Sequence, residues 1–384
     1  MSAAFDAVVV GGGPAGSAAA RMMASKGYRV GVLEEHSSSG VPTQCAGLVT
    51  DEVIRMSGVS PEVYNTLYGA EVVFPDGESL EVCSEWPKAK VVDRAGLDRL
   101  MAEAAADAGA EYSYGDRYVS HSVSKDGAFV RSSSGERKCE AVVGADGHSS
   151  AVARSLGHNP VKEYVRGVQM DLDVAMDRQD LFRIRIGHRY APGFFSWEIP
   201  CGDFTRVGLC TSWSEGPPYV RLKALVEDCY PGARVIAKYC GKIPLGGRKA
   251  IHGERCLLIG DAASQVKPVS GGGLYPALRA APILAEVLSS ALESGDLSAR
   301  SLSRYDKMCR DDFGKGLDRS YLLRRMYLRM DDDDLSRCGA YSAREDVHSV
   351  LNEIDLDDPG KVIRRVAHTP ALARGLLLLP RCLI

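Results

Sequence analysis

Short apolar runs alternate with helix-like patterns near the N-terminus. The run Phe5–Val10 is apolar and ends at three glycines, which predicts a buried strand. The alanine- and methionine-rich stretch Ser17–Ser25 predicts a helix, and Arg29–Leu33 predicts a second strand that ends at Glu34. Strand, helix and strand in this order predict a β-α-β unit with parallel strands.

The same pattern returns further along the chain. Residues 93–112 predict a helix, because apolar side chains recur there at helical spacing, and residues 139–157 predict strand, turn and helix. Between about 160 and 245, short alternating runs predict antiparallel strands. Residues 254–288 again predict buried strand, glycine turn and helix. The part after about 296 is expected to be helical and charged.

This order predicts an α/β fold in which a discontinuous Rossmann-type nucleotide-binding domain receives an inserted antiparallel-sheet substrate domain. A helical C-terminal region follows, and the acidic run 331–334 is expected to be a solvated turn or a helix start. The predicted boundaries are 1–48, 92–157 and 241–295 for the nucleotide domain, 49–91 and 158–240 for the substrate domain, and 296–384 for the helical region.

Composition narrows the function classes. The chain has 384 residues with 45% hydrophobic residues and a formal net charge of -3, so bulk charge does not favour a nucleic-acid partner. Its 11 cysteines have no zinc-type spacing and its eight histidines form no cluster, so we expect no metal site. Scattered cysteines in odd number favour a reduced, cytoplasmic protein. No segment approaches the roughly 18 apolar residues of a spanning helix.

The glycine turn after the first strand has the spacing of a dinucleotide fingerprint, Gly11-x-Gly13-x-x-Gly16. The first glycine permits a tight turn, the second lets the backbone approach a pyrophosphate, and the third lets helix pack on strand. The helix start then offers free N–H groups to the phosphates. Glu34 lies where a carboxylate would bind ribose hydroxyls, with Glu35 as the less favoured alternative.

A second glycine-rich turn strengthens this interpretation. In "LLIGDAASQVKPVSGGGLYPAL", Asp261 ends a strand, and Gly271, Gly272 and Gly273 open a helix. The carboxylate can accept hydrogen bonds from a polyol chain. The N–H groups at the helix start favour negative charge, which a reduced flavin carries around N1 and O2.

Three motifs then resemble a known superfamily. The first fingerprint, "VVGADG" (142–147) and "GDAASQVKP" with "SGGG" are similar to the para-hydroxybenzoate-hydroxylase-like FAD-dependent oxidoreductases. More narrowly, "PTQCAG" (42–47), "FFSWEIP" (194–200) and "VKPVSGGGLYPAL" resemble the geranylgeranyl reductase family, over roughly residues 5–290. The resemblance implies FAD as cofactor. It also implies a reaction that saturates isoprenoid double bonds, including those of archaeal membrane phospholipids.

The resemblance also implies site residues. The positions that fall where the family contacts FAD are Ala15, Gly16, Glu34, Cys45, Ala46, Arg94, Asp261, Gly273 and Leu274, with Val119 near the adenine. Phe195, Trp197 and Pro200 match the family box that lines the lipid site. Ile199 replaces a family phenylalanine, Cys210 replaces a glycine, and Cys45-Ala46-Gly47-Leu48 replaces Cys-Gly-Glu-Gly.

Catalysis needs hydride from reduced FAD and a proton from a general acid. Cys45 is the leading candidate for the acid, because thiols are ordinarily protonated at neutral pH, and Tyr275 is the second. The expected partners are a long isoprenoid lipid, an electron donor such as NADPH or ferredoxin, and a peripheral membrane contact through the apolar run 375–380. Two alternatives are a flavin monooxygenase or halogenase, and a non-catalytic prenyl-lipid carrier.

Overall fold

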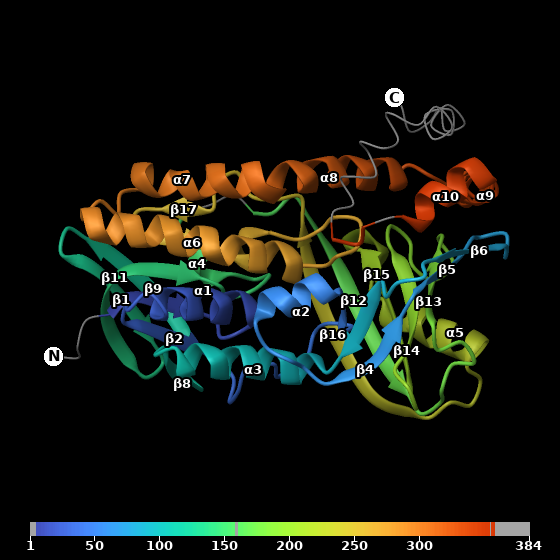
Figure 1. The fold of residues 1–384 in the computed structure, drawn as a ribbon, viewed down its shortest axis with the longest axis horizontal. Coiled ribbons are helices and arrows are strands. Elements are labelled where there is room, and N and C mark those ends of the chain that lie inside the picture. The colour runs from blue at the N-terminus through green and yellow to red at the C-terminus, as the bar shows by residue number, and fades with distance from the viewer. Residues whose placement is uncertain (1–4, 158–159, 354, 358–384) are drawn as a thin grey trace.

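The computed structural model describes residues 5–157, 160–353 and 355–357. Two large sheets lie side by side along the long axis, and a layer of helices runs over both of them (Figure 1). This is the predicted α/β architecture, so the fold class expected from the sequence is confirmed.

The first sheet has eight strands in the order β17-β18-β11-β1-β2-β8, with β10 and β9 extending from β11. Strands β18, β11, β1, β2 and β8 are parallel, and β2 is buried along its whole length. The strands are β1 (Phe5–Val10), β2 (Val30–Glu34), β8 (Glu111–Tyr114), β9 (Tyr118–Ser124), β10 (Gly127–Ser132), β11 (Gly135–Gly144), β17 (His252–Gly253) and β18 (Cys256–Leu258).

Helices with small buried residues pack on this sheet. Helix α1 (Pro14–Ala24) lies between α3 (Arg94–Asp107) and α6 (Leu274–Ser294), and buries Ala19, Ala20 and Met23. Small side chains let these helices approach closely, so strand β1 and helix α1 share one core with the C-terminal half of the chain. Short helices α2 (Asp51–Ser57) and α4 (Ala151–Ser155) complete this part.

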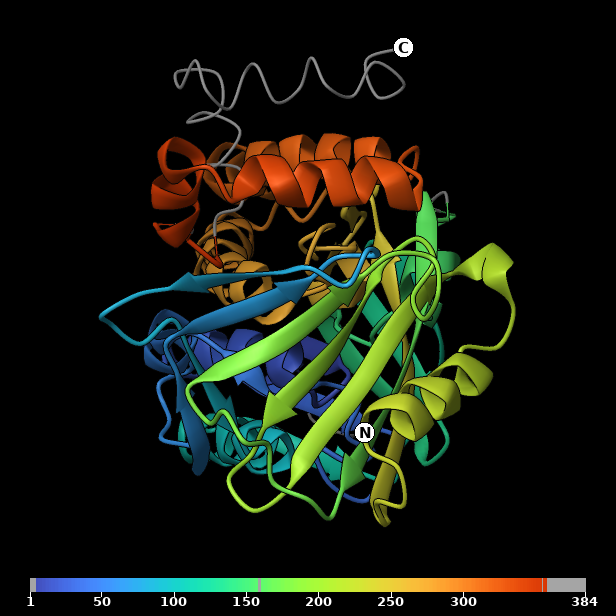
Figure 2. The same cartoon turned by 90° about the vertical axis from the view of Figure 1, so that its right-hand side faces the viewer.

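The second sheet has seven strands in the order β16-β12-β15-β14-β13-β5-β6, all antiparallel except β13 with β5. They are β5 (Gly69–Val73), β6 (Ser79–Cys83), β12 (Glu163–Leu172), β13 (Leu181–Ile186), β14 (Phe195–Pro200), β15 (Thr205–Ser212) and β16 (Val235–Leu245). A small sheet joins β3 (Leu48–Val49), β7 (Ala89–Val92) and β4 (Val63–Leu67). Helix α5 (Tyr219–Cys229) covers the outer face of the second sheet, in front of it in Figure 2.

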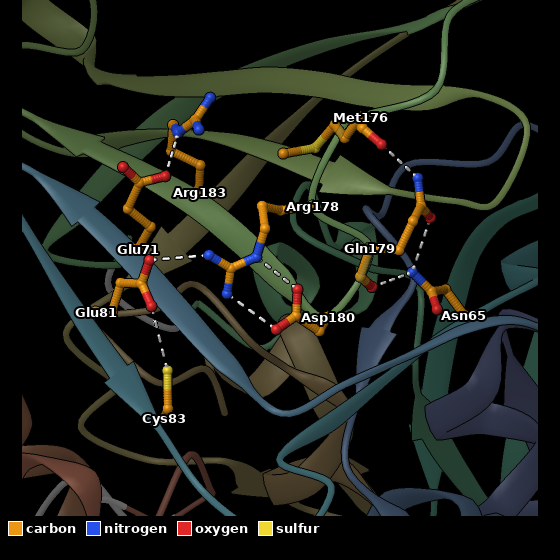
Figure 3. A network of polar contacts seen from close by, with 9 residues as sticks. All are labelled: Asn65, Glu71, Glu81, Cys83, Met176, Arg178, Gln179, Asp180 and Arg183. Atoms are coloured by element: carbon orange, nitrogen blue, oxygen red, sulfur yellow. Dashed lines mark hydrogen bonds and ion pairs between the residues drawn. The ribbon is translucent and has the colours of Figure 1, made fainter.

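Ion pairs join the edge strands of the second sheet (Figure 3). Arg178 bonds Asp180 at 2.8 Å and Glu81 of β6 at 3.0 Å. Arg183 of β13 bonds Glu71 of β5 at 2.6 Å. The Arg178 pairs are exposed and the pair of Arg183 with Glu71 is half-buried, and we assign all of them to the joining of these strands rather than to the chemistry of the site.

The C-terminal helices form the upper layer in Figure 1. They are α7 (Ala299–Cys309), a π-helical turn (Arg310–Gly314), α8 (Lys315–Tyr327), α9 (Asp332–Ser342) and α10 (Glu345–Asn352). Asp331 caps α9, and its carboxylate accepts from the backbone N–H of Asp334 at 2.8 Å. The prediction of a solvated turn or helix start at 331–334 is therefore confirmed.

One predicted helix was too long. The sequence predicted helix over residues 93–112, whereas α3 ends at Asp107 and residues 111–114 form β8. Gly109 has φ +106°, which ends the helix, and β8 then pairs with β2 in the parallel sheet. Burial beside β2 outweighs the local preference for helix. The domain boundaries remain a proposal, and both β7 and β16 cross proposed limits.

Candidate active site

The first glycine turn joins β1 to α1. Gly11 has φ +106°, and a Cβ there would lie 2.3 Å from the carbonyl oxygen of Ala145. A Cβ on Gly16 would lie 1.9 Å from the carbonyl oxygen of Gly11. Both positions therefore require glycine. A Cβ on Gly13 would meet nothing within 4 Å, so the backbone beside the start of α1 is open to a phosphate group.

Glu34 lies against this turn at the end of β2. Its Oε2 accepts from the N–H of Gly12 at 2.7 Å, and its Oε1 accepts from the N–H of His36 at 2.9 Å. The Ser39 hydroxyl donates to the Gly12 carbonyl at 2.6 Å. A carboxylate can accept about four hydrogen bonds, so Glu34 retains capacity for a ribose. Glu35 is exposed, whereas Glu34 is buried at the turn. No motif indicated His36 or Ser39.

The second glycine-rich turn meets the first. Gly260 has φ +66°, and a Cβ there would lie 2.6 Å from the Cβ of Ala15. This close approach places Asp261 beside the start of α1. A Cβ on Gly273 would lie 2.9 Å from the Asp261 Oδ1, so the carboxyl faces the start of α6. Chain segments about 245 residues apart thus meet, and we call the region between the two glycine turns the groove.

Asp261 is a desolvated carboxyl group. Burial raises its pKa to about 6, and the nearby Arg94 guanidinium opposes this shift. Within the described residues its carboxylate accepts no hydrogen bond. The side chain is half-buried, and a carboxyl group without a partner among the described residues fits a cofactor that supplies hydroxyl groups, as the ribityl chain of FAD does. The open backbone at Gly13 and the spare capacity of Glu34 fit the rest of that cofactor.

The turn at Cys45 and the start of α3 meet at the same groove. Arg94 donates to Asp98 through Nε at 2.9 Å and Nη2 at 3.0 Å. Burial opposes the charge of Arg94, but Asp98 and the Cys45 sulfur outweigh burial and raise the pKa of the guanidinium. Cys45 is partly exposed, and its sulfur lies close enough to the Arg94 guanidinium to favour the charged form of that group.

The second sheet holds the Cys45 turn from the other side. Gln169 of β12 donates its side-chain amide to the Cys45 carbonyl at 3.2 Å. Arg206 of β15 donates to the Ala46 carbonyl at 2.8 Å and is itself paired with Asp171 at 2.8 Å. Gln169, Arg206 and Asp171 carried no sequence signal, because each sits within a strand and far from any motif.

The inner face of the second sheet is aromatic. Phe195 stacks on Phe194 with ring centroids 4.6 Å apart and meets Trp197 edge-on at 6.0 Å. Trp197 packs on Gly208, where a Cβ would lie 2.5 Å from the indole ring. A Cβ on Gly271 would lie 3.0 Å from Ile243 and 3.4 Å from Phe194. The glycine-rich turn therefore borders the aromatic face directly.

Pro200 is not part of that face. Residues alternate along β14, so Phe195, Trp197 and Ile199 point inward, while Ser196, Glu198 and Pro200 point outward. The isoleucine that replaces a family phenylalanine thus does face inward, whereas Pro200 ends the strand and its carbonyl accepts from Asn65 at 3.1 Å.

Tyr275 lies in the first turn of α6 beside a buried lysine. Lys267 donates to Asp357 Oδ1 at 3.1 Å and to the Leu356 carbonyl at 2.7 Å, and its Nζ is 6.0 Å from the Tyr275 ring. Thr50 donates to the other Asp357 oxygen at 2.5 Å. Burial raises the pKa of the Tyr275 phenol. Residues 355–357 therefore connect Thr50, which precedes α2, with Lys267, which precedes α6, at this end of the groove.

The remaining predicted positions lie around the groove. Ala15 and Leu274 are partly buried against the core, at the starts of α1 and α6. Val119 is exposed on β9, which follows a turn whose Asp116 N–H donates to the Glu34 carbonyl at 2.9 Å. The apolar run 375–380 lies outside the described residues.

The described residues contain neither a metal-binding cluster nor a membrane-spanning helix. No three His, Cys, Asp or Glu side chains in residues 5–157, 160–353 and 355–357 are grouped to hold a metal ion. No helix in the same part has the length and apolarity needed to cross a bilayer.

A Rossmann-type sheet, two glycine turns on one groove and an adjoining aromatic sheet define an FAD-dependent oxidoreductase. Residues 4–206 match the family model described as FAD binding domain. Similar proteins are named digeranylgeranylglycerophospholipid reductase. One from Methanothermobacter thermautotrophicus is 32% identical and covers 86% of this chain and 90% of its own length. One from Methanosarcina mazei is 30% identical, over 93% and 92%. The chain belongs to this reductase family, as the sequence motifs predicted.

Solved structures agree on the fold. A geranylgeranyl bacteriochlorophyll reductase-like protein from Thermoplasma acidophilum superimposes with a TM-score of 0.86 at 21% identity, over 98% of this chain and 99% of that one. A flavin-dependent brominase has a TM-score of 0.73 at 17% identity, over 95% and 98%. The FAD-dependent oxidoreductase class is therefore established from sequence relatives, and the fold is shared with halogenases.

Proposed function

We propose that this protein saturates double bonds in the geranylgeranyl chains of a membrane glycerophospholipid or its precursor. The observation that carries the proposal is the contact between the glycine-rich turn and the aromatic face, through Gly271, Ile243 and Phe194. A prenyl chain has almost no polar group, so a surface of aromatic and aliphatic side chains fits it. Bound FAD, once reduced, supplies the hydride.

The cofactor roles follow from the groove. Gly11, Gly13 and Gly16 with the start of α1 would hold the pyrophosphate, and Glu34 would bind ribose. Asp261 would accept from the ribityl chain, and Arg94 keeps N–H donors free beyond its pair with Asp98. The backbone positions that complete this proposed set are Ala15, Cys45, Ala46, Val119, Gly273 and Leu274.

Saturating an alkene also needs a proton, and Cys45 is the proposed donor. Its turn is held by Gln169 and Ala46 is held by Arg206, so the thiol has a fixed place at the groove. Tyr275 is the second candidate. Its raised pKa keeps the phenol protonated at neutral pH, but the ring lies beside Lys267 and residues 355–357.

The experiment that tests the proposal is anaerobic reduction of the purified holoenzyme, followed by addition of an unsaturated prenyl glycerophospholipid and mass analysis. We expect a gain of two hydrogens per saturated double bond. Oxygen- or halide-dependent product with no gain of hydrogen would instead favour the monooxygenase or halogenase alternative. A protein that binds the lipid but never takes up FAD would favour the carrier.

The reaction requires an electron donor, and we propose that it is a diffusing molecule or protein. The sequence has one clear dinucleotide fingerprint, at Gly11–Gly16, and the proposal gives that one to FAD. NADPH and ferredoxin are the candidates. Stopped-flow reduction of the bound flavin by each donor under argon separates them.

Gly208→Ala is expected to impair lipid turnover without removing FAD. The new methyl group would lie 2.5 Å from the Trp197 ring, so the indole must move from the aromatic face. Overpacking of this kind costs about 1 kcal/mol when the neighbour can shift. Turnover and flavin absorbance together check the result. Wild-type turnover in this variant would show that the Trp197 ring is not part of the lipid-binding surface.

FAD affinity is expected to fall when the pH is lowered below about 6. The pKa of Asp261 is about 6 in the free protein because of burial, so the acceptor carboxylate is present above that pH and lost below it. Fluorescence titration with FAD between pH 8 and pH 5 measures the effect. Asp261→Asn should show weaker binding with a flatter pH profile. An equal slope in wild type and mutant would assign the titration to another group.

A further inference from the structure

Strand β16 has two different faces and one free edge. Among the described residues, it pairs with β12 alone in the second sheet. On the inner face, Gly241 lies near Gln44 and Ile243 near Gly271, so this face adjoins the proposed lipid-binding surface around Phe194 and Trp197, which we call the lipid chamber. On the outer face, Lys238 donates to the Tyr219 hydroxyl at 3.1 Å. One strand therefore separates the chamber from the solvent side of the sheet.

Exposed apolar side chains gather on the outer side of this strand. Trp213 is 49% exposed, Val220 72% and Ile236 47%, with Tyr219 and Val235 also exposed. They lie on the short turn after β15, on α5 and at the start of β16, which face the viewer in Figure 2. These segments hold five of the sixteen large hydrophobic residues exposed in the described part of the chain.

Cations lie among these apolar groups. The Arg166 guanidinium is 3.8 Å from the centroid of the Trp213 ring, and the Lys242 Nζ is 6.0 Å from it. Lys238 lies over Tyr219 at 5.6 Å. We call the whole set the β16 patch, which consists of Arg166, Trp213, Tyr219, Val220, Val235, Ile236, Lys238 and Lys242.

Two nearby carboxylates are engaged elsewhere. Asp228 of α5 pairs with Arg189 at 2.7 Å, and Glu215 pairs with Arg221 at 3.6 Å. The β16 patch contains three cations and no carboxylate, so no negative side chain cancels their charge within the patch. A surface with tryptophan, tyrosine, aliphatic groups and uncancelled cations is complementary to the headgroup region of an anionic bilayer.

We propose that the β16 patch docks this protein on an anionic lipid surface. The inference rests on the proposed function, since a lipid-embedded substrate must leave a membrane to reach the chamber. Docking at β16 would place the free edge of that strand at the bilayer, with the inner residues Gly241 and Ile243 directly behind it. Lysines next to an anionic surface contribute about 1 kcal/mol each, and salt screens the attraction.

The test is co-sedimentation of the FAD-loaded full chain with vesicles of phosphatidylcholine, with and without 30% phosphatidylglycerol (a fraction of roughly this size gives a clear surface charge). We expect binding to the anionic vesicles that decreases as salt increases. Lys238→Gln with Lys242→Gln should lower partitioning roughly 30-fold, from two lost cations. Trp213→Ser should lower binding to the same vesicles at every salt concentration.

Matched controls are Trp86→Ser and Lys125→Gln. Trp86 is 75% exposed between β6 and β7, and Lys125 is exposed in the turn between β9 and β10, so both lie outside the β16 patch. These variants should bind vesicles like the wild type. Flavin absorbance and thermal melting report whether each variant is folded. Equal losses in the controls and the patch variants would overturn the assignment to this surface.

Turnover separates this inference from the proposed function. With substrate dispersed in detergent, the patch variants should match the wild type, while with substrate in anionic vesicles they should be slower. If detergent-dispersed lipid is never reduced, the proposed function fails whatever the vesicles show. If vesicles bind wild type and patch variants alike, the docking surface is wrong. Slower flavin reduction by an acidic donor protein in the patch variants, without any change in vesicle binding, would make the patch a protein interface and overturn the proposal.

Discussion

Cys45→Ala is expected to slow the reduction of prenyl lipid by roughly 10²–10⁴-fold, the usual effect of removing a general acid. The variant should still bind FAD, because the pair between Arg94 and Asp98 and the partners of Glu34 do not depend on the thiol. Anaerobic single-turnover assays measure the chemical step, and flavin absorbance measures cofactor content. The change should fall on the reaction of reduced enzyme with lipid, and not on flavin reduction.

Cys83→Ala is a matched control, since Cys83 is also a partly buried free cysteine but lies on β6. It should turn over lipid at the wild-type rate. A wild-type rate in Cys45→Ala would leave that residue as a packing or flavin contact. Tyr275→Phe would then be the next variant, and normal rates in both would assign the proton to water.

Asp261→Ala is expected to weaken FAD binding tenfold or more while the fold is retained. A hydrogen bond to a charged group contributes about 1.5–3 kcal/mol, and the carboxylate accepts no hydrogen bond among the described residues. Removing the carboxylate abolishes its contact with the cofactor. It also removes a charged group that desolvation disfavours, so the flavin-free protein should melt no lower than wild type. Isothermal titration with FAD measures the loss of affinity, and thermal melting without FAD measures the stability of the flavin-free protein.

Asp334→Ala is the contrasting variant. Asp334 is a buried carboxylate, whereas Asp261 is half-buried, and Asp334 lies in the capping box of α9, far along the chain from the groove. Loss of a cap costs about 1 kcal/mol, so this variant should melt lower yet bind FAD normally. Unchanged FAD affinity in Asp261→Ala, with Asp334→Ala as expected, would remove Asp261 from the proposed cofactor set.

The sequence by itself determined the local units of the fold. The run Phe5–Val10, the glycine spacing after it and Glu34 at the next strand end are all set within about thirty residues, and the structure has each of them. Such units are readable because strand periodicity, glycine torsion angles and capping act between near neighbours. The family motifs added FAD and the reductase class, which the relatives support.

Only the tertiary structure decided which of these units meet. Helix α3 ends at Asp107 and not at residue 112 as predicted, because the following residues form β8 and pair with β2. Local helix preference does not encode this contact. Pro200 does not lie on the aromatic face, because side chains alternate along β14 and Pro200 points to the side opposite to Trp197.

The environment of the candidate acid and of the carboxyl group was also invisible in the sequence. Cys45, Arg94 and Asp261 come from three segments far apart in the chain, and their mutual effects on charge arise only after packing excludes water. The link from Lys267 to Asp357 crosses about ninety residues and carries no periodic signal. Local preferences act along the chain, whereas burial and charge interactions depend on distances in space, so the sequence specified the parts and folding placed their chemistry together.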